Sequence, residues 1–251
     1  MRENLHPSGN FKIKLAKISA KIISSIILFI LSIFFKINKK NSEVIISSAF
    51  FAPWKNDKKF KSFYSKIFDT TILDTKRLYT LWFFSNNLKK VNADILDIGC
   101  LKGGAGFVMS KANKNGKVYL IDTFAGLIED DHNHSKKHFI FRDINFVNQK
   151  IKKLGLKKTS VHKLNFPSSA NKIIKSSKIK LCHLDVNTFN STKRSFNFVK
   201  KKLIKNGIIV FDDYGIHNAF SIKKFVDRLI KKDNDFTYVN NYMGQCILIK
   251  K

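Results

Sequence analysis

The sequence predicts an α/β protein with a doubly wound, mostly parallel sheet and a helical extension at its N-terminus. From residue 92 onward, short apolar runs alternate with segments long enough to form helices. Strands separated in this way pair in parallel through right-handed crossovers. The last two apolar runs are separated only by the turn from Tyr242 to Gly244, so they predict an antiparallel pair.

Seven strands are expected, because seven short apolar runs are each bounded by polar residues or glycine. They cover residues 93–99, 117–122, 159–164, 179–186, 207–213, 236–241 and 245–251. Helices are expected from a glycine-rich turn through Ala112 and over residues 144–154, 168–176, 191–202 and 217–231. A further helical pattern between Asp69 and Leu88 offers Leu73, Leu78, Leu81, Trp82 and Leu88 as buried positions.

Composition divides the chain into a basic and apolar N-terminal segment (1–42), a helical lead-in (43–90) and the alternating domain (91–251). The apolar stretch 22–35 covers roughly 21 Å as a helix, which is short of a ~30 Å hydrocarbon core. Lysines flank it on both sides. We therefore expect membrane contact through residues 11–40, either on the surface or as a marginal span. Packing of this helix on the body or on a second subunit, and hence a homo-oligomer, is the alternative.

The formal charge of +29 is supplied almost wholly by lysine, since the chain has only five arginines. Such a field favours anionic membranes, nucleic acids or anionic substrates. Nucleic-acid readers use arginine forks for base contacts, so the scarcity of arginine argues against a nucleic-acid partner. Cys100, Cys182 and Cys246 form no disulfide framework, which is typical of a reducing cytosol. We expect a cytoplasmic protein, with attachment to the inner face of the membrane left open.

Three carboxylates follow two of the expected strands: Asp185 in LCHLDVNT, and Asp212 with Asp213 in IIVFDDYG. If these strands are neighbours in a parallel sheet, the three acids converge on one edge and repel one another. A divalent cation relieves that repulsion, and oxygen ligands of this kind suit Mg²⁺ or Mn²⁺. The alternative is that each aspartate only caps the helix after its strand.

The first strand is followed by the glycine-rich turn DIGCLKGGAG, from Asp97 to Gly106. Glycines let the backbone approach a ligand, and the helix N-terminus after them attracts negative charge. Asp122 ends the second strand about twenty residues later, where an acid suits ribose hydroxyls. A tight turn and a helix-capping aspartate are the structural alternative.

The blocks DIGCLKGGAG, LIDTFAGL, LDVNTFNST and GIIVFDDYG resemble the macrocin O-methyltransferase family of class I enzymes that use S-adenosylmethionine. The resemblance covers residues 75–230 and implies a Rossmann-like sheet in the order 3-2-1-4-5-7-6. It implies a magnesium site on Asp185, Asp212 and Asp213. The candidate cofactor-binding residues are Asp97, Gly99, Gly103, Gly104, Asp122, Asn165 and Phe166, with Asp122 at the ribose and the last two near the adenine.

The resemblance therefore implies a magnesium-dependent O-methyltransferase that acts on a hydroxyl of a sugar or of a glycosylated or lipid-linked acceptor. Asp185 is the candidate catalytic base as well as a metal ligand. The family's usual second acid is replaced by Asn187. Two alternatives stay open: a cephalosporin hydroxylase-like relative with other chemistry, and a non-enzymatic basic protein that binds nucleic acid or membrane.

The histidines are weaker candidates. His132, His134 and His138 lie in a long polar loop, where one could act as an alternative base, but a solvated loop is the simpler interpretation. His183 alternates with Leu184 in the fourth strand and is expected to be a hydrogen-bonded core residue. Tyr214 and His217 either border the acceptor pocket or pack the turn.

Overall fold

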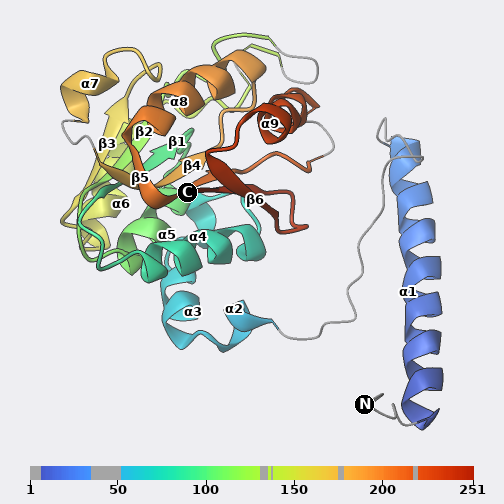
Figure 1. Cartoon of the computed structure of the whole chain (residues 1–251). Coiled ribbons are helices and arrows are strands. Elements are labelled where there is room, and N and C mark those ends of the chain that lie inside the picture. The colour runs from blue at the N-terminus through green and yellow to red at the C-terminus, as the bar shows by residue number, and fades with distance from the viewer. Residues whose placement is uncertain (1–6, 35–51, 131–134, 137, 175–177, 217–219) are drawn as a thin grey trace. The chain divides into compact units, whose positions relative to one another are not determined.

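A computed structural model describes residues 7–34, 52–130, 135–136, 138–174, 178–216 and 220–251 (Figure 1). The chain forms two compact units, Met1–Pro53 and Trp54–Lys251. The expected boundary at residue 90 therefore falls inside the second unit, and residues 54–90 belong to the same compact unit as the sheet.

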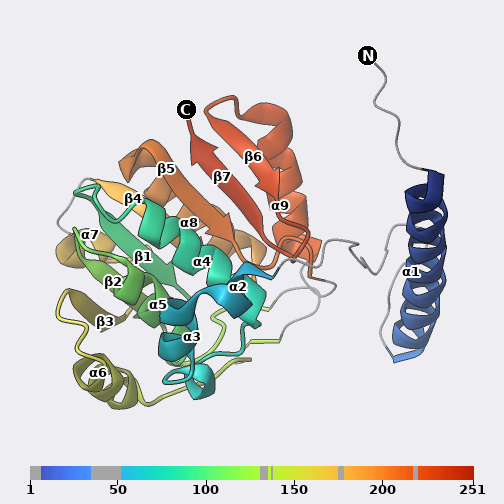
Figure 2. The same ribbon diagram turned by 90° about the horizontal axis from the view of Figure 1, so that it is seen from below.

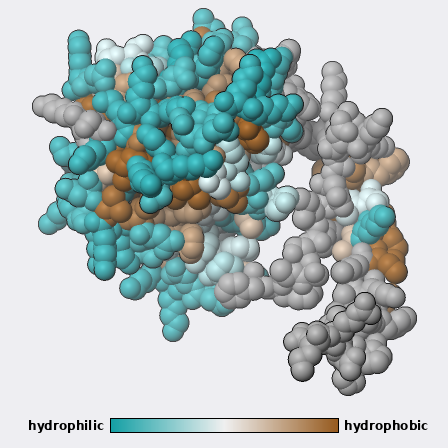
Figure 3. Space-filling model, viewed as in Figure 1, coloured by the Kyte–Doolittle hydropathy of each residue, from teal (hydrophilic) through white to brown (hydrophobic). Residues whose placement is uncertain are grey.

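The described part of the first unit is dominated by the long helix α1 (Pro7–Phe34). Large apolar side chains along it are exposed, among them Ile18, Ile22, Ile26 and Ile33. Figure 3 shows apolar and hydrophilic side chains together on its described part, whereas the visible surface of the second unit is largely hydrophilic. Within the described residues, no helix combines the length and the apolar character needed to cross a membrane. Residues 35–40 of the expected membrane-contacting segment lie outside the described residues.

The second unit is built on a seven-stranded sheet in the order β3-β2-β1-β4-β5-β7-β6, which confirms the predicted fold class and strand order. All neighbouring strands pair in parallel except β7, which is antiparallel to both β5 and β6. The strands are β1 (Asp94–Ile98), β2 (Val118–Asp122), β3 (Thr159–Lys163), β4 (Ile179–Leu184), β5 (Leu203–Phe211), β6 (Phe236–Asn240) and β7 (Cys246–Lys250).

Helices cover both faces of this sheet, as Figure 2 shows for α4 and α5 on one side and for α8 and α9 on the other. The helices are α2 (Pro53–Asn56), α3 (Lys58–Tyr64), α4 (Thr75–Asn87), α5 (Gly104–Ala112), α6 (Ile144–Lys153), α7 (Ala170–Ile173), α8 (Phe189–Lys202) and α9 (Phe220–Lys232), with a 3₁₀ turn at Phe68–Thr70. Side chains alternate between the faces of a strand, so each strand contributes to two cores. In β1, Ile95 packs in the core with α3 to α6, and Leu96 packs in the core with α7 to α9.

The lead-in helices are part of the first of these cores. Phe60, Leu78 and Leu81 are almost fully buried there. Asp57 caps α3 by accepting a hydrogen bond from Phe60 N, and its second oxygen accepts one from Trp82 Nε1 at 2.9 Å. These bonds join α3 to α4, and the shared core together with the bond from Ser85 Oγ to Met109 O holds the lead-in against the sheet and α5.

Candidate active site at the carboxyl edge of the sheet

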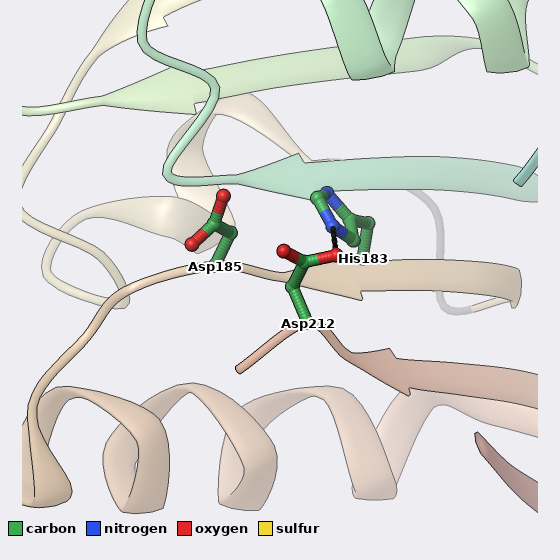
Figure 4. A group of neighbouring side chains, drawn as sticks. All are labelled: His183, Asp185 and Asp212. Atoms are coloured by element: carbon green, nitrogen blue, oxygen red, sulfur yellow. Dashed lines mark ion pairs between the residues drawn. The ribbon is translucent and has the colours of Figure 1, made fainter. Parts of the chain in front are cut away.

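Strand register brings the predicted acids together. Leu184 of β4 pairs with Phe211 of β5, so the next residue of each strand, Asp185 and Asp212, emerges at the same edge. The ladder continues one step further, because Asp212 N donates to Leu184 O at 3.0 Å and Asp185 N donates to Ile98 O at 2.9 Å. Figure 4 shows both carboxylates at this edge with His183 beside them. The convergence expected from the sequence is thus present.

A cavity of about 290 Å³ opens at this edge. Its described lining includes five of the seven candidate cofactor residues, namely Gly99, Gly104, Asp122, Asn165 and Phe166. It also includes Asp185, Asp212 and Asp213. Among the described residues, Asp97 and Gly103 are not part of the lining. The loops predicted to hold a cofactor and the acids predicted to hold a metal therefore face one cavity.

The glycine turn allows three chain segments to meet behind this cavity. Gly99 has a φ of +89°, and a Cβ there would lie 1.8 Å from the carbonyl oxygen of Asp185. At Gly104 a Cβ would lie 2.6 Å from Cβ of Thr71 in the lead-in. Gly103 has a φ of +91° and precedes α5. The glycines at 99 and 104 therefore permit close packing between loops of the protein behind the cavity.

Asp122 joins the loop after β1 to the loop after β2. One carboxylate oxygen accepts from Leu101 N and the other from Phe124 N, both at 2.8 Å. Burial raises the pKa of Asp122, although these hydrogen bonds oppose that rise. A carboxylate has further acceptor capacity, so these two bonds leave sites for ligand hydroxyls.

The pKa values of the three carboxylates shift in different directions. Burial raises the pKa of Asp185 well above its ordinary value, and the charges of Asp213 and Asp212 add to that rise. Burial and the charge of Asp212 raise the pKa of Asp213 to about 6. Burial raises the pKa of Asp212, but the pairing with His183, the charge of Arg77 and the hydrogen bond from Gln245 lower it overall. Asp212 is therefore the acid of the three whose pKa is lowered.

His183 is a buried, hydrogen-bonded residue of β4, as expected, and its neighbours there are the acids Asp97 and Asp212. Its Nδ1 lies 2.8 Å from Asp97 Oδ1, and its Nε2 lies 3.3 Å from Asp212 Oδ1. Burial lowers the pKa of His183, but its pairing with these two carboxylates raises it well above the ordinary value. Candidate ligand atoms of His183, Asp185 and Asp212 lie within 4.8 Å of one another, and the predicted ligand Asp213 is not in this group, although it lines the same cavity. Both ring nitrogens of His183 face carboxylates, so the imidazole is engaged by the cluster and is not open to a metal ion.

Arg77 of α4 is a residue of this site that the sequence analysis did not single out. Its Nη1 donates to Asp212 Oδ2 and lies 3.9 Å from Asp213 Oδ1. It lines the cavity, as do Thr70 and Thr71 of the same lead-in. The available signal was the scarcity of arginine in a lysine-rich chain, since a guanidinium forms directed pairs with carboxylates that lysine does not match.

The remaining candidates lie elsewhere. His132, His134 and His217 fall outside the described residues. His138 is not among the described residues that line the cavity, although its neighbour Phe139 is. Tyr214 donates to Asp227 Oδ1 at 2.9 Å and so packs against α9.

Comparison with known proteins decides the family. The family model described as macrocin O-methyltransferase (TylF) matches residues 30–240. The chain belongs to the macrocin O-methyltransferase family. It is accordingly an S-adenosylmethionine-dependent O-methyltransferase, and this sets aside the non-enzymatic alternative. No curated protein sequence matches the chain.

Solved structures share the fold of this macrocin O-methyltransferase family member at low sequence identity. The O-methyltransferase NovP is 15% identical, with a TM-score of 0.60, over 72% of this chain and 82% of its own. The calicheamicin methyltransferase CalS11 is 10% identical, with a TM-score of 0.59, over 81% of this chain and 99% of its own. TomG from Streptomyces achromogenes, solved in complex with S-adenosylmethionine, is 12% identical, with a TM-score of 0.52, over 78% and 91%.

Proposed function

We propose that this enzyme transfers the methyl group of S-adenosylmethionine to a hydroxyl of a sugar or of a glycosylated or lipid-linked acceptor, with a divalent cation at the acidic cluster. The observation that carries the proposal is that one cavity is lined both by the glycine turn with Asp122 and by Asp185, Asp212 and Asp213. A methyl donor and an acceptor hydroxyl bound in that cavity lie next to each other, and positioning is the main source of catalysis for such a transfer.

The cofactor half of the cavity fits the donor. Gly99 and Gly104 present backbone without side chains, so the amino-acid portion can approach the start of α5. Asp122 retains acceptor capacity for ribose hydroxyls. Asn165 and Phe166, after β3, offer an amide and an aromatic face for the adenine. The bound donor supplies a sulfonium-activated methyl group.

The acidic cluster also fits a divalent cation. Asp213 Oδ2 is buried and has no hydrogen-bond partner among the described residues. Burial and, after it, the charges of the neighbouring aspartates raise the pKa values of Asp185 and Asp213, and a bound cation would oppose both effects. Asp185 and Asp213 would hold the cation, with Asp212 beside them. A Mg²⁺ or Mn²⁺ ion there supplies Lewis acidity that lowers the pKa of a bound hydroxyl.

Asp185 is the group proposed to take the hydroxyl proton. It is half-buried directly after β4, and its backbone is fixed by the bond to Ile98 O and by the close packing on Gly99. A general base must sit within hydrogen-bond reach of the proton it accepts, which such a fixed carboxylate satisfies for a hydroxyl held at the cluster. Asn187 Nδ2 donates to Asp185 Oδ1 at 3.4 Å, so the amide that replaces the family's acid orients the proposed base.

The test is transfer of a labelled methyl group to a panel of sugar and glycolipid acceptors. Asp185→Asn and Asp213→Asn should each lower turnover by about 10²- to 10⁴-fold while cofactor affinity, measured by calorimetry, changes little. Normal turnover of these variants in EDTA would rule out the metal mechanism. Modification of acceptors without incorporation of the label would favour the cephalosporin hydroxylase-like alternative.

We also propose that α1 contacts an anionic membrane surface and brings the enzyme to a lipid-linked acceptor. The supporting observation is the exposure of Ile18, Ile22, Ile26 and Ile33 in a segment flanked by lysines. Apolar side chains insert at the interface while lysines pair with anionic headgroups.

Flotation of the full chain with vesicles of anionic or neutral lipid tests this idea. Ile22→Asp with Ile26→Asp should abolish binding to anionic vesicles, whereas Ile230→Asp, a change at an exposed isoleucine of α9, should not. Binding that survives the double change would refute membrane contact through α1. If the wild type forms dimers but binds no vesicles, and the double variant is monomeric at the same concentration, α1 would instead be assigned to contact between two copies of the chain.

A further inference from the structure

Arg77 joins the lead-in to the acidic cluster. Its side chain is 14% exposed, and its Nε donates to Asp74 Oδ2, the residue that caps α4, at 2.9 Å. Its Nη1 donates to Asp212 Oδ2 and lies 3.9 Å from Asp213 Oδ1. One planar guanidinium thus links a helix N-terminus to a carboxylate 135 residues away in the chain.

The charges around Arg77 are not balanced. Asp185, Asp212 and Asp213 line one cavity, and the cations in contact with this cluster in the described part of the chain are Arg77 and His183. The guanidinium stays charged at every working pH. Asp212 Oδ2 is bound by Arg77, while its Oδ1 accepts from Gln245 Nε2 at 2.8 Å and faces His183. Both carboxylate oxygens of Asp212 therefore have partners within the protein. Asp185 and Asp213 retain carboxylate oxygens that a ligand can contact.

We infer that Arg77 is a positioning residue that serves as the resident counter-ion of the cluster: it fixes Asp212 and weakens the binding of a divalent cation at Asp185 and Asp213. The inference rests on the proposed cation site. A guanidinium close to the Asp213 carboxylate repels any cation bound there, and this repulsion is strong because the site is largely buried. The cation is then held loosely enough to exchange, while the protein stays folded without it.

This role predicts opposite effects on metal binding and on turnover. Removing the guanidinium charge should tighten cation binding by about tenfold or more. Turnover at saturating metal and cofactor should fall by about tenfold or more, because Asp212 and α4 lose their mutual anchor. A residue with a merely structural role would weaken metal binding and cofactor binding together when it is lost.

The experiment measures Mn²⁺ binding to the full chain by electron paramagnetic resonance, with cofactor affinity measured separately by calorimetry. Arg77→Gln should bind Mn²⁺ at least about tenfold more tightly than the wild type, and Arg77→Lys should stay within a few-fold of the wild type. Arg228→Gln is the matched control, because it removes the same charge from α9, away from the cavity. If Arg77→Gln does not fold, the neutral Arg77→Met replaces it.

Unchanged or weaker Mn²⁺ binding by the neutral variants overturns the inference, as does the absence of Mn²⁺ binding by both wild type and variants. Mn²⁺ binding by the neutral variants alone supports it, because the counter-ion then excludes the metal from the wild type. Failure of the wild type to bind S-adenosylmethionine contradicts the proposed function but leaves the Mn²⁺ comparison intact. The two ideas can therefore fail separately.

Discussion

We expect the charged Asp213 carboxylate to lower the free energy of unfolding of the metal-free protein at neutral pH. The substitution Asp213→Asn should restore that free energy. The carboxylate is buried beside Asp212, which raises its pKa from 3.8 to about 6 in the folded state. A rise of about 2 pKa units corresponds to about 3 kcal/mol of free energy. Because the folded protein holds this proton more tightly than the unfolded chain, the stabilisation is complete below pH 3.8 and is lost as the pH rises to about 6.

The amide introduced by Asp213→Asn carries no charge, so the variant should escape this loss. Urea unfolding in EDTA should show the variant more stable than the wild type by up to about 3 kcal/mol at about pH 7 to 8, with the difference shrinking toward about pH 4. Asp69→Asn, which removes an exposed carboxylate paired with Lys150 instead of the cluster, is the control and should show no such gain. A variant that is less stable than the wild type above the folded-state pKa, or a difference that does not change with pH, would refute the reasoning.

Three further outcomes follow from contacts around the cavity. Gly99→Ala should destabilise the fold by about 3 kcal/mol or more in thermal unfolding, because its Cβ would lie 1.8 Å from the Asp185 carbonyl at a φ of +89°; an unchanged melting temperature would contradict this. Lys180→Met should cost about 2–4 kcal/mol in denaturant unfolding, since four oxygens surround the buried ammonium within hydrogen-bond distance, and a neutral result would show that those acceptors find other partners. Glu129→Ala should raise the dissociation constant for S-adenosylmethionine several-fold with little change in melting temperature, because its carboxylate ties the loop after β2 to the start of α8; unaltered calorimetric affinity would mean that this tie does not shape the site.

Local patterns in the chain were enough to predict the sheet and the place of the acids. Each strand is a local apolar run, and the handedness of the crossovers limits how such runs can be ordered. An aspartate at the end of an inner parallel strand must emerge at the carboxyl edge, so Asp185, Asp212 and Asp122 could be assigned to the cavity from their positions alone. These inferences need only local pattern and a general rule of connection.

The groups that balance those acids could be identified only from the packed chain. Arg77 and Gln245 reach Asp212 from a helix before the sheet and from the turn that leads into β7, and no periodicity links these positions. The alternation of residues in β4 predicts that His183 is buried, but it does not predict which residue lies beside it on the neighbouring strand. In the structure that neighbour is Asp97 of β1. The lead-in lines the site for the same reason, since Thr71 meets Gly104 through packing between distant segments. Charge compensation depends on distances of a few ångströms between such segments, and those distances are set when the whole chain packs.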